Sequence, residues 1–463
     1  MVFSSLFFLY LFLPICVLCY AVSKKIQYRN FILIVFSLFF YAWGEPLCVL
    51  LLMISSLINY ALALLIEKHR DEKGAKVAVT TAVVFDLLML GIFKYSGFIA
   101  ENLNLILPFD IPVPDVRLPI GISFFTFQII SYVIDCYWEK TEVQKSYPKL
   151  LMYVSLFPQL VAGPIVRYST IESEISNRQT TLTDLSEGIS RFSVGLAKKV
   201  ILANNLSSIV DSFFTGNISE LSILGTWYAV IIYAMQIYFD FSGYSDMAIG
   251  LGRIFGFHFD ENFNYPFICK DVSEFWQRWH ISLSTFFRDY LLYIPIFGKR
   301  RKFGGLFLVW FCTGLWHGAS WNYIIWGLYF GLFIFFEMLI GKKRMKKIPL
   351  VIRHIYNKIV IIIGFGIFYF EDMNGLGNFF KNIFGLNSNS LVDEFTKLSA
   401  VNNIFLLVIA VLCCFPISKT VNRLAEKKDT LLYTVSSAKI AVNLILLIIS
   451  SIMLVDSTNN PFL

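Results

Sequence analysis

Apolar runs long enough to cross a membrane recur along the whole chain, with short polar segments between them. A transmembrane helix needs about 20 consecutive apolar residues, and runs near this length lie at about 3–21, 46–66, 78–98, 119–137, 222–240, 319–341, 355–371, 402–418 and 436–455. Shorter or polar-interrupted runs, which could span, tilt or re-enter, lie at about 30–43, 147–165, 190–214 and 303–316. The pattern predicts an all-α polytopic membrane protein with roughly 11 to 13 transmembrane helices plus re-entrant or amphipathic helices.

The composition agrees with this prediction. Hydrophobic residues make up 57% of the 463 positions and charged residues only 15%, whereas soluble domains carry about 25% charged residues. Residues 3–21 have no basic segment before them and no small-residue cleavage site after them, so we expect a retained first span and not a signal peptide. The net charge of +7 needs no nucleic acid to explain it, because the cations gather between the apolar runs.

The cations occur in alternate connecting segments, which allows an orientation to be predicted. Basic clusters lie at about 24–29, 67–76, 140–149, 342–347 and 419–428, while the segments at 43–46 and 108–119 contain few cations. Basic loops stay in the cytoplasm under the positive-inside rule. We therefore expect a multi-pass protein of the cell membrane with both termini outside.

The eight cysteines are scattered and mostly lie within apolar runs. Cys16 and Cys19 form a C-x-x-C in the first run, but no second pair or histidine is near them. We interpret all eight as small buried residues, not as disulfides or metal ligands. The chain also has no Walker A, Rossmann or metal-ligand motif, so neither a metal nor a tightly bound cofactor is expected.

Polar and aromatic residues concentrate between 238 and 322, unlike the rest of the chain. The segment 273–292 is too charged to span a bilayer, and its interleaved aromatic and charged residues predict a helix at the interface or in a polar cavity. Charges within membranes usually pair with one another. We therefore expect ion pairs between two carboxylates and two cations of this region, namely Asp240 and Asp246 with Arg278 and Arg288.

The motif Trp316-His317-Gly318 places a titratable imidazole in a stretch that is otherwise apolar enough to lie within a membrane. A histidine in hydrocarbon is costly and marks a functional site by default, and its near-neutral pKa suits proton transfer. Gly314 and Gly318 would let another backbone or a ligand approach closely. The alternative is a structural His317 that donates to a carbonyl, and the alternative for His280 is an interfacial histidine. The other three histidines are interpreted as solvated or structural: His69, His258 and His354.

Seven short stretches are distinctive in their order and spacing: 119–124, 158–165, 238–250, 261–266, 275–284, 287–290 and 314–318. With them the chain resembles the membrane-bound O-acyltransferase family, over about residues 5–340. The similarity is to the branch that contains the alginate O-acetylation and teichoic acid D-alanylation membrane proteins, which implies a bacterial cell membrane. This resemblance implies one membrane domain over 1–463, with tilted helices around a central tunnel. Within it we expect N-terminal helices at 1–137, a catalytic core at 138–341 and C-terminal helices at 342–463.

The resemblance also implies roles for individual residues. His317 would be the catalytic base, and His280 occupies the family's second catalytic position. The substrate or tunnel would be lined by Asp240, Ser242, Tyr244, Asp246, Trp279, Arg288, Asp289, Trp316 and Trp321. Independently of the resemblance, four cations could bind the phosphates of coenzyme A: Arg278, Lys299, Arg300 and Arg301. The alternative for the run at 299–302 is a cytoplasmic anchor under the positive-inside rule.

The implied reaction moves an acetyl group from cytoplasmic acetyl-CoA to an exported polysaccharide or cell-envelope glycan, directly or through a secreted SGNH-type acetyltransferase partner. The stretch Ile296-Phe297-Gly298-Lys299 departs from the Gly-Gly-Asn-Arg common in alginate-type proteins, which leaves the acceptor open. One alternative within the family is D-alanyl transfer to teichoic acid from a carrier-protein thioester. Alternatives from other classes are a transporter of a small polar substrate and a structural subunit.

Overall fold

Helices are the only regular elements in the part of the chain that the computed structural model describes, residues 1–161, 163–292, 302–427 and 429–456. This confirms the predicted all-α class. By their internal contacts, the described residues form two compact units. The first comprises Met1–Phe192 and Ser245–Asp260, and the second comprises Ser193–Tyr244 and Glu261–Leu463.

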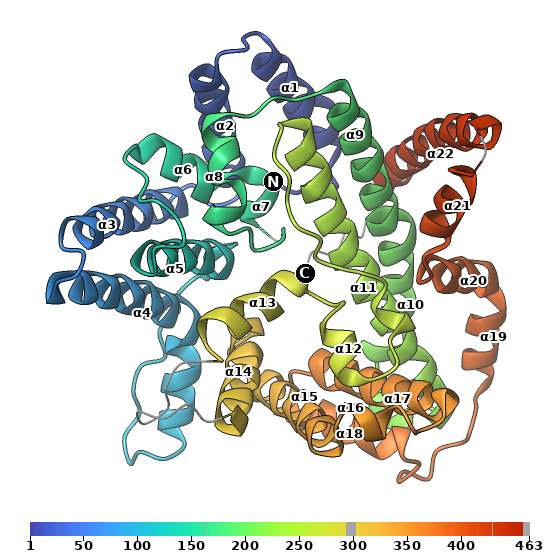
Figure 1. The fold of residues 1–463 in the computed structure, drawn as a ribbon. Helices are drawn as coiled ribbons and strands as arrows, with labels where there is room; N and C mark the ends of the chain where they lie inside the picture. The colour runs from blue at the N-terminus through green and yellow to red at the C-terminus, as the bar shows by residue number, and fades with distance from the viewer. Residues whose placement is uncertain (162, 293–301, 428, 457–463) are drawn as a thin grey trace. The chain divides into compact units, whose positions relative to one another are not determined.

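The first unit is built from short and long apolar helices. Helices α3, α4 and α5 pack against one another, and α2 packs against α6 (Figure 1). The bounds are η1 (Phe8–Phe12), α1 (Leu13–Ala21), α2 (Ile26–Ala42), α3 (Cys48–Lys68), α4 (Lys73–Asn104), α5 (Ile122–Tyr137), α6 (Tyr147–Ser155), α7 (Phe157–Leu160), α8 (Tyr168–Ser176) and the start of α9 (Leu182–Ala197).

The second unit holds the polar region singled out in the sequence, except for its residues 245–260, which belong to the first unit. Helices α14 and α15 form its most extensive helix pair, and α15 also packs on α17. The elements up to α13 are η2 (Lys198–Ala203), α10 (Asn204–Phe214), η3 (Ile218–Glu220), α11 (Ile223–Ile254, which extends into the first unit), η4 (Pro266–Ile268), α12 (Val272–Trp276) and α13 (Ile281–Tyr290). The later helices are α14 (Lys302–His317), α15 (Trp321–Ile340), α16 (Lys342–Met345), α17 (Leu350–Tyr369), α18 (Met373–Ile383), α19 (Glu394–Asn402), α20 (Ile404–Cys413), α21 (Ile417–Ala425) and α22 (Asp429–Asp456).

Fewer described helices are long and apolar enough to cross a membrane than the 11 to 13 expected. Five meet that condition, namely α3, α4, α15, α17 and Tyr433–Val455 of α22; the pair α19 and α20, bent by 64°, would make a sixth. Several other apolar runs form helices of only 10–17 residues. The run at 147–165 breaks at Leu156. In a continuous helix Pro158 would have no N–H to donate to the Val154 carbonyl, and its ring would clash with that carbonyl.

All eight cysteines are free, as expected, but they are not all buried. Cys413 is exposed, and Cys19, Cys48 and Cys312 are half-buried. The interpretation of every cysteine as a buried residue was therefore wrong for these four. In an apolar helix such as α20, a thiol can face outward at little cost because it behaves as a small hydrophobe.

Two glycines bring α14 and α15 into backbone contact. The carbonyl oxygen of Trp310 occupies the place where a Cβ on Gly327 would lie, and the carbonyl oxygen of Tyr323 does the same for Gly314. Only a residue without a side chain allows two helices to approach this closely. The close contact fixes the end of α14, where His317 lies, against the first turns of α15.

Candidate active site

His317 is the last residue of α14 and is half-buried. Its ring meets three aromatic rings edge-on, with centroid distances of 5.0 Å to Trp316, 4.9 Å to Trp326 and 5.1 Å to Phe368. Edge-to-face packing of this kind holds a ring in one orientation while adding little polarity. The imidazole is thus held in a mainly apolar pocket built by α14, α15 and α17.

His280 is the N-cap of α13 and has a left-handed backbone conformation, with φ of 44° and ψ of 54°. Non-glycine residues seldom adopt this region. Asn262 holds the turn: its carbonyl oxygen accepts from the Ile281 N–H at 3.0 Å, and its side-chain Oδ1 accepts from the N–H and hydroxyl of Ser282 at 3.2 and 2.9 Å.

The same Asn262 Oδ1 lies 3.3 Å from Nδ1 of His280. Because this oxygen can only accept, the contact places the imidazole proton on Nδ1 and leaves the Nε2 lone pair available. Nε2 is buried and has no hydrogen-bond partner among the described residues. Burial lowers the pKa of His280 to about 3, so its ring is neutral at physiological pH.

Trp316 is a neighbour of both histidines. Its ring centroid lies 5.6 Å from that of His280 and 5.0 Å from that of His317. Phe241 of α11 closes another side of His280 at 4.7 Å. The structure therefore brings together two histidines that are 37 positions apart in the sequence, around one buried indole.

The expected ion pairs around residues 240–246 differ from those in the structure. Within the second unit, Lys199 Nζ lies 2.5 Å from Asp240 Oδ1, and both side chains are buried. Within the first unit, Arg191 pairs with Asp246 at 2.8 Å. The expectation that Arg278 and Arg288 would pair with these aspartates was wrong, because each arginine has a nearer acid.

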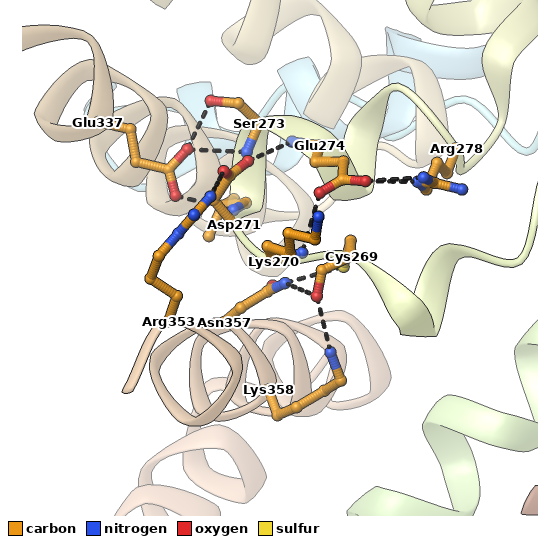
Figure 2. Close-up of polar contacts among 11 residues, drawn as sticks. Cys269, Lys270, Asp271, Ser273, Glu274, Arg278, Glu337, Arg353, Asn357 and Lys358 are labelled. Atoms are coloured by element: carbon orange, nitrogen blue, oxygen red, sulfur yellow. Dashed lines mark hydrogen bonds and ion pairs between the residues drawn. The ribbon is translucent and has the colours of Figure 1, made fainter. Parts of the chain in front are cut away.

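Arg278 pairs with Glu274 one helical turn before it, at 2.7 Å, and Arg288 pairs with the adjacent Asp289, also at 2.7 Å. Glu274 belongs to a polar network around the short helix α12, which Figure 2 shows together with Asp271, Glu337 and Arg353. The predicted single segment 273–292 is thus two helices, α12 and α13, with His280 at the turn between them.

Comparison with known proteins shows the family to which the chain belongs. The model of the membrane-bound O-acyltransferase family matches residues 35–377 of the chain. The chain belongs to the membrane-bound O-acyltransferase family. It is accordingly a multi-pass membrane protein and an O-acyltransferase.

Named relatives of this O-acyltransferase come from several bacteria. A probable alginate O-acetylase of Azotobacter vinelandii is 38% identical over 85% of this chain and 80% of its own length. A peptidoglycan O-acetyltransferase of Helicobacter pylori is 33% identical over 72% of this chain and 69% of its own length. A teichoic acid D-alanyltransferase of Bacillus subtilis is 32% identical over 50% of this chain and 62% of its own length.

The remaining predicted site residues of this O-acyltransferase fall into different environments. Ser242 and Tyr244 of α11 are buried, and Trp279 is buried with its ring stacked on Phe275 at 5.4 Å. Trp321, at the start of α15, is 49% exposed, and Arg288 has 57% of its side chain exposed. Lys299, Arg300 and Arg301 lie outside the described residues. Among the described residues, no group of three or more His, Cys, Asp or Glu side chains could hold a metal ion.

Sequence reasoning did not single out three residues that bind polar groups of this region: Asn262, Lys199 and Glu337. Asn262 and Lys199 carry no local signal, since their partners lie 18 to 41 positions away. Glu337 did carry a signal, because it is the one charged residue in the apolar α15. An ionisable group within an apolar helix is a functional hypothesis by default.

Proposed function

We propose that this O-acyltransferase transfers an acetyl group from cytoplasmic acetyl-CoA to an exported polysaccharide or cell-envelope glycan. The observation that carries the proposal is the placement of His280 and His317 around Trp316 in one aromatic pocket. The printed names of relatives that match most of the chain support acetyl as the group and a glycan as the acceptor. The relative named for D-alanyl transfer matches only half of the chain, so acetyl is favoured.

His317 is the general base of the proposed reaction. It takes the proton of a glycan hydroxyl as that oxygen attacks the thioester carbonyl, a C–O bond forms and the C–S bond to coenzyme A breaks. The proton then passes to the departing sulfur, which leaves as the thiol. General base catalysis of this kind contributes about 10²- to 10⁴-fold.

His280 has a different role from His317 in the proposed reaction. With Nδ1 directed at Asn262, its Nε2 can accept a hydrogen bond but cannot donate one. It therefore suits a second hydroxyl or an amide N–H of the bound substrates. The rings of Trp316, Trp326 and Phe368 keep the pocket apolar, which strengthens each of these hydrogen bonds.

The donor would enter from the cytoplasm and the acceptor from the opposite side, directly or through a secreted SGNH-type partner. In support, the densest basic cluster is exposed on α16 and the residues after it. Basic loops of this kind remain in the cytoplasm. Arg278 and the predicted Lys299–Arg301 segment are the proposed contacts for the phosphates of coenzyme A.

A complementation experiment tests the proposal. In a strain lacking this gene, His317→Ala should insert at the wild-type level but leave the extracellular glycans without the acetyl esters that wild type restores. His69→Ala is the matched control, because the side chain of His69 is 40% exposed and pairs with Glu72, and it should restore acetylation fully. Unchanged acetyl ester content with His317→Ala would remove the base assignment. Loss of D-alanyl instead of acetyl esters on deletion would replace the proposed donor with an aminoacyl thioester.

A further inference from the structure

The carboxylate of Glu337 binds the beginning of helix α12 from a different helix. Its two oxygens accept hydrogen bonds from the backbone N–H groups of Val272 and Ser273, both at 2.8 Å, and from the Ser273 hydroxyl at 2.5 Å (Figure 2). Glu337 is buried and is the one charged residue of α15. A buried carboxylate is tolerated only with several donors of this kind.

A second carboxylate completes the attachment of α12. The side chain of Asp271 accepts from the Glu274 N–H at 2.8 Å, and its other oxygen lies 2.7 Å from Arg353 of α17. The first three N–H groups of a helix have no partner within the helix, and here all three are bound by carboxylates. We call Glu337, Asp271 and Arg353 the α12 clamp; it attaches α12 to α15 and to α17.

The α12 clamp matters for His280 because only three residues separate α12 from that histidine. The Trp279 N–H still donates to the Phe275 carbonyl oxygen at 2.9 Å, so a hydrogen-bonded turn connects the end of α12 to the residue before His280. His280 itself has a left-handed conformation that costs about 1–3 kcal/mol and persists only where the surroundings fix it. Asn262 fixes the turn after His280, and α12 fixes the chain before it.

Helix α15 also contacts the other histidine. Trp326 in its second turn packs on His317 at 4.9 Å and on Trp276 of α12 at 5.4 Å. Helix α15 therefore contacts His317 in its second turn. Near its C-terminal end it holds α12, the helix that leads to His280.

We propose that Glu337 is a positioning residue of the acyl transfer reaction, which sets the place of His280 relative to His317 by holding α12 on α15. The inference rests on the proposed function for its kinetic consequence, but its structural consequence can be measured independently. Glu337 does not touch the substrates in this proposal; it acts through α12 and His280.

Glu337→Gln is the principal test, because the amide keeps the size of the side chain but replaces one accepting oxygen with a donor. In the purified full-length protein, the kcat for acetyl transfer from acetyl-CoA should fall about a hundredfold, the loss typical of a misplaced catalytic group. The KM for acetyl-CoA should change by less than about threefold, since the lost interaction is not with the donor. Glu394→Gln is the matched control, because Glu394 is an exposed acid paired with Lys397, and it should leave both values unchanged.

The second measurement is independent of activity. Diethyl pyrocarbonate modifies accessible imidazoles, and His280 is only 1% exposed in the wild-type fold. Mass spectrometry should find His280 protected in wild type and Glu394→Gln but modified in Glu337→Gln. If wild type consumes no acetyl-CoA, the proposed function fails, while the protection of His280 still tests the positioning role.

Ser273→Ala provides a second variant if Glu337→Gln does not accumulate. It removes one of the three donors to Glu337 and leaves the charge in place. We therefore expect a smaller fall in kcat and a smaller extent of His280 modification than in Glu337→Gln. The positioning role is wrong if the accumulating variant, Glu337→Gln or Ser273→Ala, keeps both the wild-type kcat and the protection of His280. It is also wrong if kcat and KM change while His280 stays protected.

Discussion

The imidazole of His280 lies edge-on to the indole of Trp316, with ring centroids 5.6 Å apart and planes inclined by 69°. Trp316 directly precedes His317, so one buried ring separates the two histidines of the proposed reaction. The aromatic residue beside His317 in the segment 314–318 thus covers part of the buried His280 ring. The backbone at His280 then determines which substitutions this arrangement tolerates.

We predict that His280→Asn retains more stability and more activity than His280→Ala. Asparagine adopts the left-handed region far more readily than alanine, for which it costs about 1–2 kcal/mol. Both variants lose the imidazole, so both should transfer more slowly than wild type. Thermal unfolding in detergent and the rate of acetyl-CoA consumption check the order of the two variants, and equal melting temperatures would contradict the role given to the backbone.

The contact of α14 with α15 predicts a large effect for a small substitution. Gly327→Ala places a methyl group against the Trp310 carbonyl oxygen, and such overpacking costs about 1–3 kcal/mol. Gly377→Ala is the matched control, since nothing lies within 4 Å of a Cβ at that helical position. It should stabilise the protein by about 0.5–1 kcal/mol, and a loss of melting temperature equal to that of Gly327→Ala would contradict the close contact.

The buried pair of Lys199 and Asp240 predicts non-additive substitutions. Lys199→Met leaves the Asp240 carboxylate without its partner and should destabilise the protein by about 3–5 kcal/mol. The double variant Lys199→Met/Asp240→Leu should recover most of that loss, because neither charge remains. Melting temperatures of the two single variants and the double variant test this, and additive losses would show that the pair is not coupled. Transfer activity of the double variant then tests the tunnel-lining role expected for Asp240.

His258 predicts a dependence of stability on pH. A hydrogen bond with Glu174, aided by Asp184, raises the pKa of His258 above its ordinary value of 6.5. A raised pKa means that the folded state binds the proton more tightly, so this stabilisation is complete below about pH 6.5 and is lost as pH rises through the folded pKa. His258→Gln should therefore lower the melting temperature more at pH 6 than at pH 9.

The effect of His258 should be small, at most about 1 kcal/mol, because its side chain is 49% exposed and solvent screens the two ion pairs. The Asp184 carboxylate stays charged over this range, since hydrogen bonds from Thr181 lower its pKa. High salt should reduce the difference between wild type and variant at low pH. An equal difference at both pH values would contradict the assignment.

The apolar runs and the two histidines could be predicted from the sequence because each is a local signal. Helical class follows from composition and run length, and His317 stands out as an ionisable group in an apolar run. His280 was singled out by the resemblance of the stretch 275–284 to the family. The lengths of the helices were less predictable. Pro158 divides the run at 147–165, and the run at 402–418 is divided between α20, which ends at Cys413, and α21, which begins after Pro416. Both runs seem continuous by hydropathy alone.

The ion-pair partners of the charged residues could not be predicted from local sequence signals. Arg278 and Arg288 pair with acids four and one positions away, where little chain entropy is lost on bringing the charges together. Asp240 takes its cation from a π-helical segment 41 positions earlier, a relationship that depends on how η2 packs on α11. The spacing of the two residues in the sequence therefore does not predict that Lys199 pairs with Asp240.

The distance along α15 between Trp326 and Glu337 has a consequence for how related sequences can differ in length. The two residues are eleven positions apart, about 16 Å along a helix that rises 1.5 Å per residue. Deleting or inserting one residue between them would rotate one contact by about 100° relative to the other. Changes in chain length among homologues are therefore expected to avoid this stretch and to fall in polar connections such as the one between α18 and α19.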